Sequence, residues 1–318
     1  MKILFLSVFL FLSRLAGYAQ ADITDAEIKD HINFLSSGKN KGRYPGTKES
    51  KRVVRYIVKD FKSNDIGPLD NSYLQYFIAR LRVRKGVTDT PHVKTCNVIG
   101  VIRGSDPVLA DEYIILGAHY DHLGMGGPSS KKPDTVAIHP GADDNASGTA
   151  ALLEIGEKLA ANRSLLKRSV ILIAFGAEEQ GLLGSKYFTE HPLVPISQIK
   201  LMINMDMIGR LNAEKQIHMG GAGTFSGGME LMKELGKAEG LNPDVHAGDV
   251  GGSDHVSFYK KQIPVIGLHT GGHPQYHTPE DVVGLINIAG EKAVSEYIYN
   301  AIIAVSERAE PITFIDQH

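Results

Sequence analysis

Apolar residues along this chain gather in short runs of strand length, separated by longer stretches in which they recur at helical spacing. Four runs are clear, at residues 113–116, 170–175, 201–205 and 265–269. Runs of this length without polar alternation are typical of strands buried on both faces. They predict the centre of a sheet.

Segments with helical spacing alternate with these runs, at residues 149–161, 183–191, 228–240 and 288–309. Such alternation predicts a mostly parallel sheet covered by helices on both faces. Other elements are expected before this alternating region. They are a helix beginning after Thr24, a second helix carrying Val53 and Phe61, and strand-like segments near 74–83 and 97–102. These early strands could add an antiparallel edge. The expected fold is a three-layer αβα arrangement around a mixed, mostly parallel sheet, in a single domain from residue 22 to 318.

The first residues have the pattern of a secretory signal peptide. Lys2 precedes an apolar run at residues 3–12, and small residues follow, among them Ala19 and Ala21. The run is too short for a membrane span, and cleavage after Ala19 or Ala21 satisfies the small-residue rule. We therefore expect residues 1–19 to be removed and the mature protein to be exported, periplasmic or extracellular, without a membrane span.

Composition narrows the classes of protein further. The net charge of −2 becomes −4 without Lys2 and Arg14, so nothing favours nucleic acid as a partner. Cys96 is the single cysteine, which excludes an internal disulfide and predicts a small buried hydrophobe. The sequence does not fix the oligomeric state.

Five polar motifs follow the apolar runs or lie between them and the helices. They are GAHYDHLG from Gly117, GADDNASG from Gly141, FGAEEQG from Phe175, NMDMIG from Asn204 and YHTPED from Tyr276. In open α/β sheets, ligands bind beyond the carboxyl ends of the strands. Side chains from these motifs should therefore meet, although they lie far apart in sequence.

Histidines and carboxylates of this kind are ligands for zinc and similar divalent ions. We expect His119 to bind metal and Asp121 to hold its other ring nitrogen. One member each of Asp143-Asp144 and Glu178-Glu179 can act as a ligand, because adjacent side chains diverge. Asp206 and His277 complete a set large enough for two ions. Three clustered carboxylates would repel one another unless two divalent cations neutralised them.

The motif set resembles that of the di-zinc aminopeptidase family, which includes secreted bacterial leucyl aminopeptidases. The resemblance extends from about Cys96 to the C-terminal helix and implies a phosphorylase/hydrolase-like zinc-peptidase fold. It implies Asp143 as the residue bridging two zinc ions, followed by a cis peptide bond. It also implies His119 and Asp206 on one ion, and Glu179 and His277 on the other.

The resemblance further implies catalytic roles and a substrate. Glu178 matches the family's general base, and Tyr276 resembles a tyrosine that hydrogen-bonds the oxyanion in some members. Asp254, in GGSDH, either shapes the substrate pocket or caps a helix. His122 matches the common HYDH pattern, without a ligand role. The expected function is an exported zinc aminopeptidase acting on the N-terminal residues of peptides.

Three alternatives stay open. The same metal core serves carboxypeptidases and dipeptidases. A glutaminyl cyclase on this fold generally uses one zinc and departs from GADDNASG, and the absence of Trp is unfavourable to it. A receptor-like binding domain that lost catalysis predicts broken ligands or a missing base, and neither is visible.

Overall fold

The computed structural model describes residues 22–83 and 86–317, arranged around one nine-stranded sheet. The predicted signal peptide lies outside the described residues. The strand order is β1-β3-β5-β4-β6-β9-β7-β8, with β2 paired to β3. The strands are β1 (Gly67–Pro68), β2 (Leu74–Arg80), β3 (His92–Ile102), β4 (Tyr113–His119), β5 (Ser169–Phe175), β6 (Ile199–Met205), β7 (Gln216–Gly220), β8 (Asn242–Val245) and β9 (Val265–His269).

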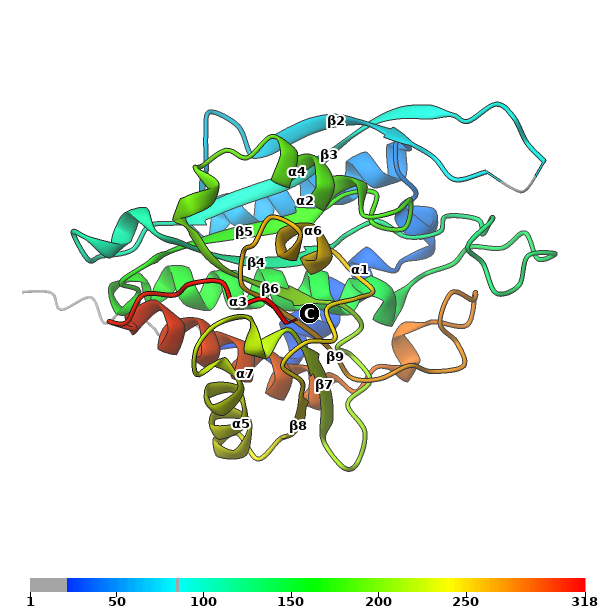
Figure 1. The fold of residues 1–318 in the computed structure, drawn as a ribbon. Helices are drawn as coiled ribbons and strands as arrows, with labels where there is room; N and C mark the ends of the chain where they lie inside the picture. The colour runs from blue at the N-terminus through cyan, green and yellow to red at the C-terminus, as the bar shows by residue number, and fades with distance from the viewer. Residues whose placement is uncertain (1–21, 84–85, 318) are drawn as a thin grey trace, which may run out of the picture.

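The centre of the sheet is parallel and its margins are mixed. Strands β5, β4, β6 and β9 pair in parallel, whereas β3 runs antiparallel to β5 and β7 antiparallel to β9. Figure 1 shows β2 and β3 at one edge and β7 and β8 at the other. The predicted mixed, mostly parallel α/β fold is confirmed, including the antiparallel edge. Sequence patterns missed β1 and β8, which are too short to show a periodicity.

Helices cover both faces of the sheet, as predicted. They are α1 (Asp25–Leu35), α2 (Lys48–Ser63), α3 (Gly148–Ala161), α4 (Leu183–Glu190), α5 (Gly228–Ala238), α6 (His255–Tyr259) and α7 (Ile288–Glu307). The first begins where predicted, since the Thr24 side chain accepts a hydrogen bond from the Glu27 amide at 3.2 Å.

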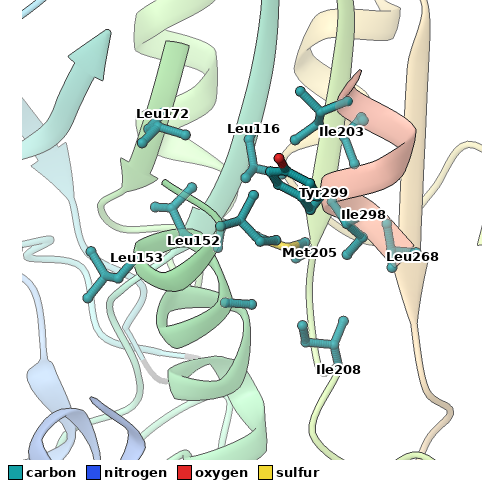
Figure 2. Close-up of a cluster of buried hydrophobic side chains, with 14 of the residues drawn as sticks. Leu116, Leu152, Leu153, Leu172, Ile203, Met205, Ile208, Leu268, Ile298 and Tyr299 are labelled. Atoms are coloured by element: carbon teal, nitrogen blue, oxygen red, sulfur yellow. The ribbon is translucent and has the colours of Figure 1, made fainter. Parts of the chain in front are cut away.

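Alternate side chains of each central strand enter different cores. Ile114 packs in a large core with α1, α2, α3 and α7, and Ile115 packs on the opposite face with Phe188 of α4 and Phe258 of α6. Figure 2 shows part of the larger core, where Leu152 and Ile298 lie against strand residues such as Leu116 and Ile203. Burial on both faces explains why these strands appear as uninterrupted apolar runs.

Parallel pairing brings the carboxyl ends of the central strands together. His119 at the end of β4 is in register with Phe175 at the end of β5, and β6 ends at Met205 beside β9. The close approach of side chains explains Gly117 in β4, because a Cβ there would lie 2.6 Å from the Phe175 ring.

Two smaller expectations concern burial and membranes. Cys96 is 4% exposed, which confirms it as a buried apolar side chain. Over residues 22–83 and 86–317, no helix combines the length and apolarity needed to cross a bilayer.

Candidate metal centre

His119 and Asp206 come from neighbouring strand ends and face one another. The Nε2 atom of His119 lies 3.3 Å from Oδ1 of Asp206 and 3.3 Å from Oδ1 of Asp144. On the other side of the ring, Nδ1 lies 3.2 Å from the backbone oxygen of Asp121. A carbonyl only accepts hydrogen bonds, so Nδ1 carries a proton, and Nε2 is the ring atom that a cation beside Asp144 and Asp206 would contact.

The carboxylate of Asp121 does not hold this ring directly. Its Oδ1 lies 3.9 Å from Nδ1 of His119 and instead accepts a hydrogen bond from the Glu178 amide at 2.9 Å. Burial raises the pKa of Asp121 to about 7. Asp121 therefore connects the loop after β4 with the loop after β5, which carries Glu178.

Asp144 occupies the centre of the site. Its Oδ2 lies 3.0 Å from Nε2 of His277, on the side opposite His119, and its side chain is almost fully buried. Burial alone would raise the pKa of Asp144, but His122, His119 and His277 hold it well below its usual range. Asp144 is therefore an ionised carboxylate placed between two groups of histidines.

Asp143, which was expected to bridge two ions, faces away from this cluster. Its Oδ1 accepts a hydrogen bond from the Gly209 amide at 2.7 Å, and its Oδ2 lies 3.1 Å from Nε2 of His273. The two side chains diverge because the backbone is not helical here, with φ −102° and ψ 95° at Asp144. The cis peptide bond expected after Asp143 lies instead between Asp144 and Asn145. The motif matches, but its central residue is one position further along.

Glu179 and His277 meet on the other side of Asp144. Oε2 of Glu179 lies 3.2 Å from Nε2 of His277, whose Nδ1 faces the Ser129 carbonyl at 2.8 Å. Oε1 of Glu179 lies 2.7 Å from Nδ1 of His122, a fully buried ring without an expected role. Burial and Asp144 would raise the pKa of Glu179, but His122 and His277 lower it to about 2.

The donor set suits two divalent cations. His119, Asp144 and Asp206 offer ligand atoms within 4.8 Å of one another, and so do His122, Asp144 and Glu179. Both groups combine imidazole nitrogen with carboxylate oxygen, which is the chemistry of zinc sites without thiolates. The two groups share Asp144, so their geometry agrees with a pair of adjacent cations.

Glu178 lies beside the cluster and faces a cleft of about 460 Å³. Its Oε2 is 3.9 Å from Nε2 of His119, further than the candidate ligands. Burial raises the pKa of Glu178 well above its usual range, and Glu179 acts in the same direction. Glu178 thus differs from Asp144 and Glu179, because its pKa is raised whereas theirs are lowered.

Tyr276 lines the same cleft. Its ring stacks on His277 at a centroid distance of 3.8 Å, and the Lys131 ammonium lies 4.3 Å from the ring centroid. Burial raises the pKa of Tyr276, with nearby carboxylates acting in the same direction. The Tyr276 hydroxyl therefore stays protonated at neutral pH and can donate a hydrogen bond.

The remainder of the cleft extends towards β7 and β9. It is bordered by His218, His246, Asp249 and His269, and by glycines that include Gly251 and Gly252. Asp254 stands at the start of α6 but makes no side-chain cap hydrogen bond, so helix capping does not explain it. Burial raises the pKa of Asp254 to about 7.

Asp281, the last residue of YHTPED, contacts the backbone of the Asp143-Asp144 loop. Its Oδ2 accepts hydrogen bonds from the amides of Asp143 and Asp144, both at 3.0 Å, and its Oδ1 pairs with Arg210 at 3.0 Å. The motif itself contained this residue, but only the fold reveals that it faces the Asp143-Asp144 loop. Asp281 fixes the backbone that carries the central carboxylate.

The strand-end cluster gives this α/β protein a candidate histidine and carboxylate site for divalent cations. The model of Peptidase family M28 matches residues 97–302, and the chain belongs to this family. The predicted resemblance to the di-zinc aminopeptidase family is thereby confirmed.

Curated relatives carry aminopeptidase names. Aminopeptidase YwaD of Bacillus subtilis is 29% identical over 232 residues, covering 70% of this chain and 47% of the relative. Leucine aminopeptidase 2 of Trichophyton equinum is 30% identical over 197 residues, covering 59% of this chain and 36% of the relative. This chain therefore matches about half, or less, of the length of these relatives.

Solved structures share the fold. A Zn-dependent exopeptidase from Parabacteroides distasonis superimposes with a TM-score of 0.73 and 20% identity, covering 90% of this chain and 99% of the other. The Porphyromonas gingivalis glutaminyl cyclase gives a TM-score of 0.71 at 20% identity, covering 90% and 100%. At this identity the likeness supports the fold, and function has to be argued from the site.

Proposed function

We propose that this protein is an exported zinc aminopeptidase, which hydrolyses the peptide bond after the N-terminal residue of a peptide. The observation that carries the proposal is the sharing of Asp144 by two groups of ligand atoms, with Glu178 beside them on an open cleft. The family and the names of the relatives support peptide hydrolysis.

In this proposal the site would hold two zinc ions, with Asp144 as the carboxylate common to both sets of ligands. His119 and Asp206 would complete one set, and Glu179 and His277 the other. His277 is preferred to His122 because it lines the cleft, whereas His122 is fully buried behind Glu179. When bound, the two zinc ions would lower the pKa of a water molecule and polarise the carbonyl of the peptide bond.

Glu178 is the proposed general base. Its carboxylate takes a proton from the attacking water and returns it to the leaving amine, which is why its position on the cleft matters. The raised pKa of Glu178 favours retention of that proton until the amine leaves. The Tyr276 hydroxyl is proposed to donate a hydrogen bond to the carbonyl oxygen as negative charge develops there.

Metal analysis combined with end-specific peptides tests this function. The purified protein should contain two zinc ions, and a chelator should stop the release of the N-terminal amino acid from an unmodified peptide. N-terminal acetylation should stop release, and C-terminal amidation should not. Release from the carboxyl end would indicate a carboxypeptidase, and one zinc with cyclisation of N-terminal glutamine would indicate the cyclase. A protein with neither metal nor turnover would favour the binding domain.

The proposal also includes export of the protein and a single catalytic domain. Lys2 and the apolar run at residues 3–12 support a signal peptide, and residues 22–318 are treated as one catalytic domain. N-terminal sequencing of protein recovered outside the cytoplasm should give a start after Ala19 or Ala21. An intact Met1 on the exported protein would contradict cleavage.

A further inference from the structure

Arg43 is a fully buried arginine from the segment before the family match, which begins at residue 97. Among the residues that the structure describes, no carboxylate lies within ion-pair distance of its guanidinium. A buried charge is costly unless hydrogen bonds compensate it. The compensation here comes from backbone oxygens.

Four of these five oxygens belong to two of the loops that carry candidate ligands, the loop after β4 and the loop of Asp144; the fifth is that of Leu35, to which Nη1 donates at 3.3 Å. Nε of Arg43 donates to the Tyr120 oxygen at 2.8 Å, between His119 and Asp121. Nη1 donates to the backbone oxygen of Pro140 at 2.5 Å. Nη2 donates to the backbone oxygens of Gly141 at 3.1 Å and Asp144 at 3.4 Å. One planar group therefore joins the loop after β4 to the loop that carries the central carboxylate.

The backbone around Arg43 is built for this contact. Gly42 and Arg43 both have positive φ, 65° and 52°. A Cβ on Gly42 would lie 2.5 Å from the His139 oxygen and 2.6 Å from the Gly124 oxygen, so the turn packs directly on the segment after His122. The Gly124 amide also donates to the Gly42 oxygen at 3.1 Å. A non-glycine residue in the left-handed region at Arg43 is consistent with a constrained, functional position.

The charge of Arg43 also acts on the site. Burial lowers the pKa of Arg43 to about 10, while Asp144, Asp121 and Asp281 act to raise it. The guanidinium is therefore charged at neutral pH and favours the ionised form of these carboxylates. The hydrogen bonds and the charge of Arg43 therefore both stabilise the same arrangement of the site.

We propose that Arg43 is a positioning residue that sets the zinc affinity of the site by holding the two ligand loops together through their backbone oxygens. The inference rests on the proposed zinc function. Loss of partners that orient metal ligands typically lowers metal affinity about 10–100-fold. Arg43→Gln should produce a loss of this size. Arg43→Lys should produce a smaller loss, because it keeps the charge but cannot reach all the oxygens.

Arg168 provides a control. It is 1% exposed and donates to the backbone oxygens of Val305, Ser306 and Arg308, at 3.2, 3.2 and 2.7 Å, and, unlike Arg43, also to a carboxylate, that of Glu112 at 2.8 Å. It precedes β5, at the end of the strand opposite the candidate metal centre. Arg168→Gln should therefore lower thermal stability without changing zinc affinity.

The experiment measures zinc affinity by competition with a chromogenic chelator, together with the melting temperature of the metal-free protein. The proposal expects weaker zinc binding in Arg43→Gln and wild-type zinc binding in Arg168→Gln. Wild-type zinc affinity in Arg43→Gln, or an equal loss in Arg168→Gln, would overturn it. If Arg43→Gln does not fold, Arg43→Lys replaces it at a temperature where all variants are folded, and unchanged affinity there also overturns it. A wild-type protein that binds no zinc would refute the proposed function instead.

Discussion

The carboxylate of Asp144 lies 3.0 Å from the Nε2 atom of His277, while its other oxygen lies 3.3 Å from Nε2 of His119. A single side chain thus connects groups delivered from β4 and from the loop after β9. The neighbouring Asp143 has the same chemistry and none of these contacts. Substituting Asp143 and Asp144 separately therefore tests which of the two aspartates binds the metal.

Asp144→Asn should abolish the binding of at least one zinc ion, because a neutral amide is a poor bridging ligand. Asp143→Asn should keep the zinc content of the parent, since Asp143 contacts Gly209 and His273 rather than the cluster. Zinc per chain, measured by atomic emission on both variants, checks this. The opposite pattern would restore Asp143 as the bridging residue.

Glu178→Gln should lower kcat by about 10²–10⁴-fold, which is the usual contribution of a general base. Zinc content should stay at the parental level, because Glu178 is further from His119 than the candidate ligands are. Glu190→Gln, at the exposed end of α4, serves as a control and should keep full activity. Loss of zinc from Glu178→Gln would make Glu178 a ligand.

The roles of His277 and His122, the two histidines near Glu179, can be distinguished by substitution in the same way. His277→Gln should remove one zinc ion, whereas His122→Gln should leave both bound at reduced affinity, because His122 orients Glu179 from the buried side. Zinc titration of the metal-free proteins measures both stoichiometry and affinity. Retention of two ions by His277→Gln, with loss of one from His122→Gln, would exchange their roles.

A fourth prediction concerns stability away from the cleft. His31 of α1 lies 3.1 Å from Glu154 of α3, and its Nδ1 lies 2.8 Å from the Tyr56 hydroxyl of α2. Burial would lower the pKa of His31, but the interactions with Glu154 and Asp60 raise it above its usual value. The protonated form is therefore favoured in the folded state.

A raised folded-state pKa contributes stability below the unfolded pKa of about 6.5, and that stability is lost as the pH rises through the folded value. His31→Gln should consequently lower the melting temperature more at about pH 6 than at about pH 9. His191→Gln, at an exposed helix end, should show no such difference. An equal loss for His31→Gln at both pH values would mean that only packing is involved.

Strand runs and helical spacing were sufficient to predict the layers of this fold. Ile114 and Ile115 face different cores, so their strand carries no polar alternation, and the same holds for the other central strands. Convergence of motifs at strand ends followed from parallel pairing alone. The elements that escaped prediction, β1 and β8, have only two and four residues.

The site was less predictable where the backbone is irregular. Spacing could not distinguish Asp143 from Asp144, because which side chain faces the cluster depends on dihedral angles in a short loop rather than on a period. His122 and Asp281 lie inside recognised motifs, but their partners are distant in sequence. Arg43 lies outside the motifs altogether and meets Asp144 across 101 positions.

The Ser129 oxygen that holds the Nδ1 atom of His277 belongs to a segment with exposed side chains, such as Met125 and Val136. The Lys131 amide also donates to the His277 oxygen, and Lys132 pairs with Glu280. The His277 imidazole, which lines the cleft, is thus oriented by a segment that reaches solvent. Substitutions at the exposed tip of that segment should therefore be tolerated, provided that the contacts of Ser129 and Lys131 with His277 are kept.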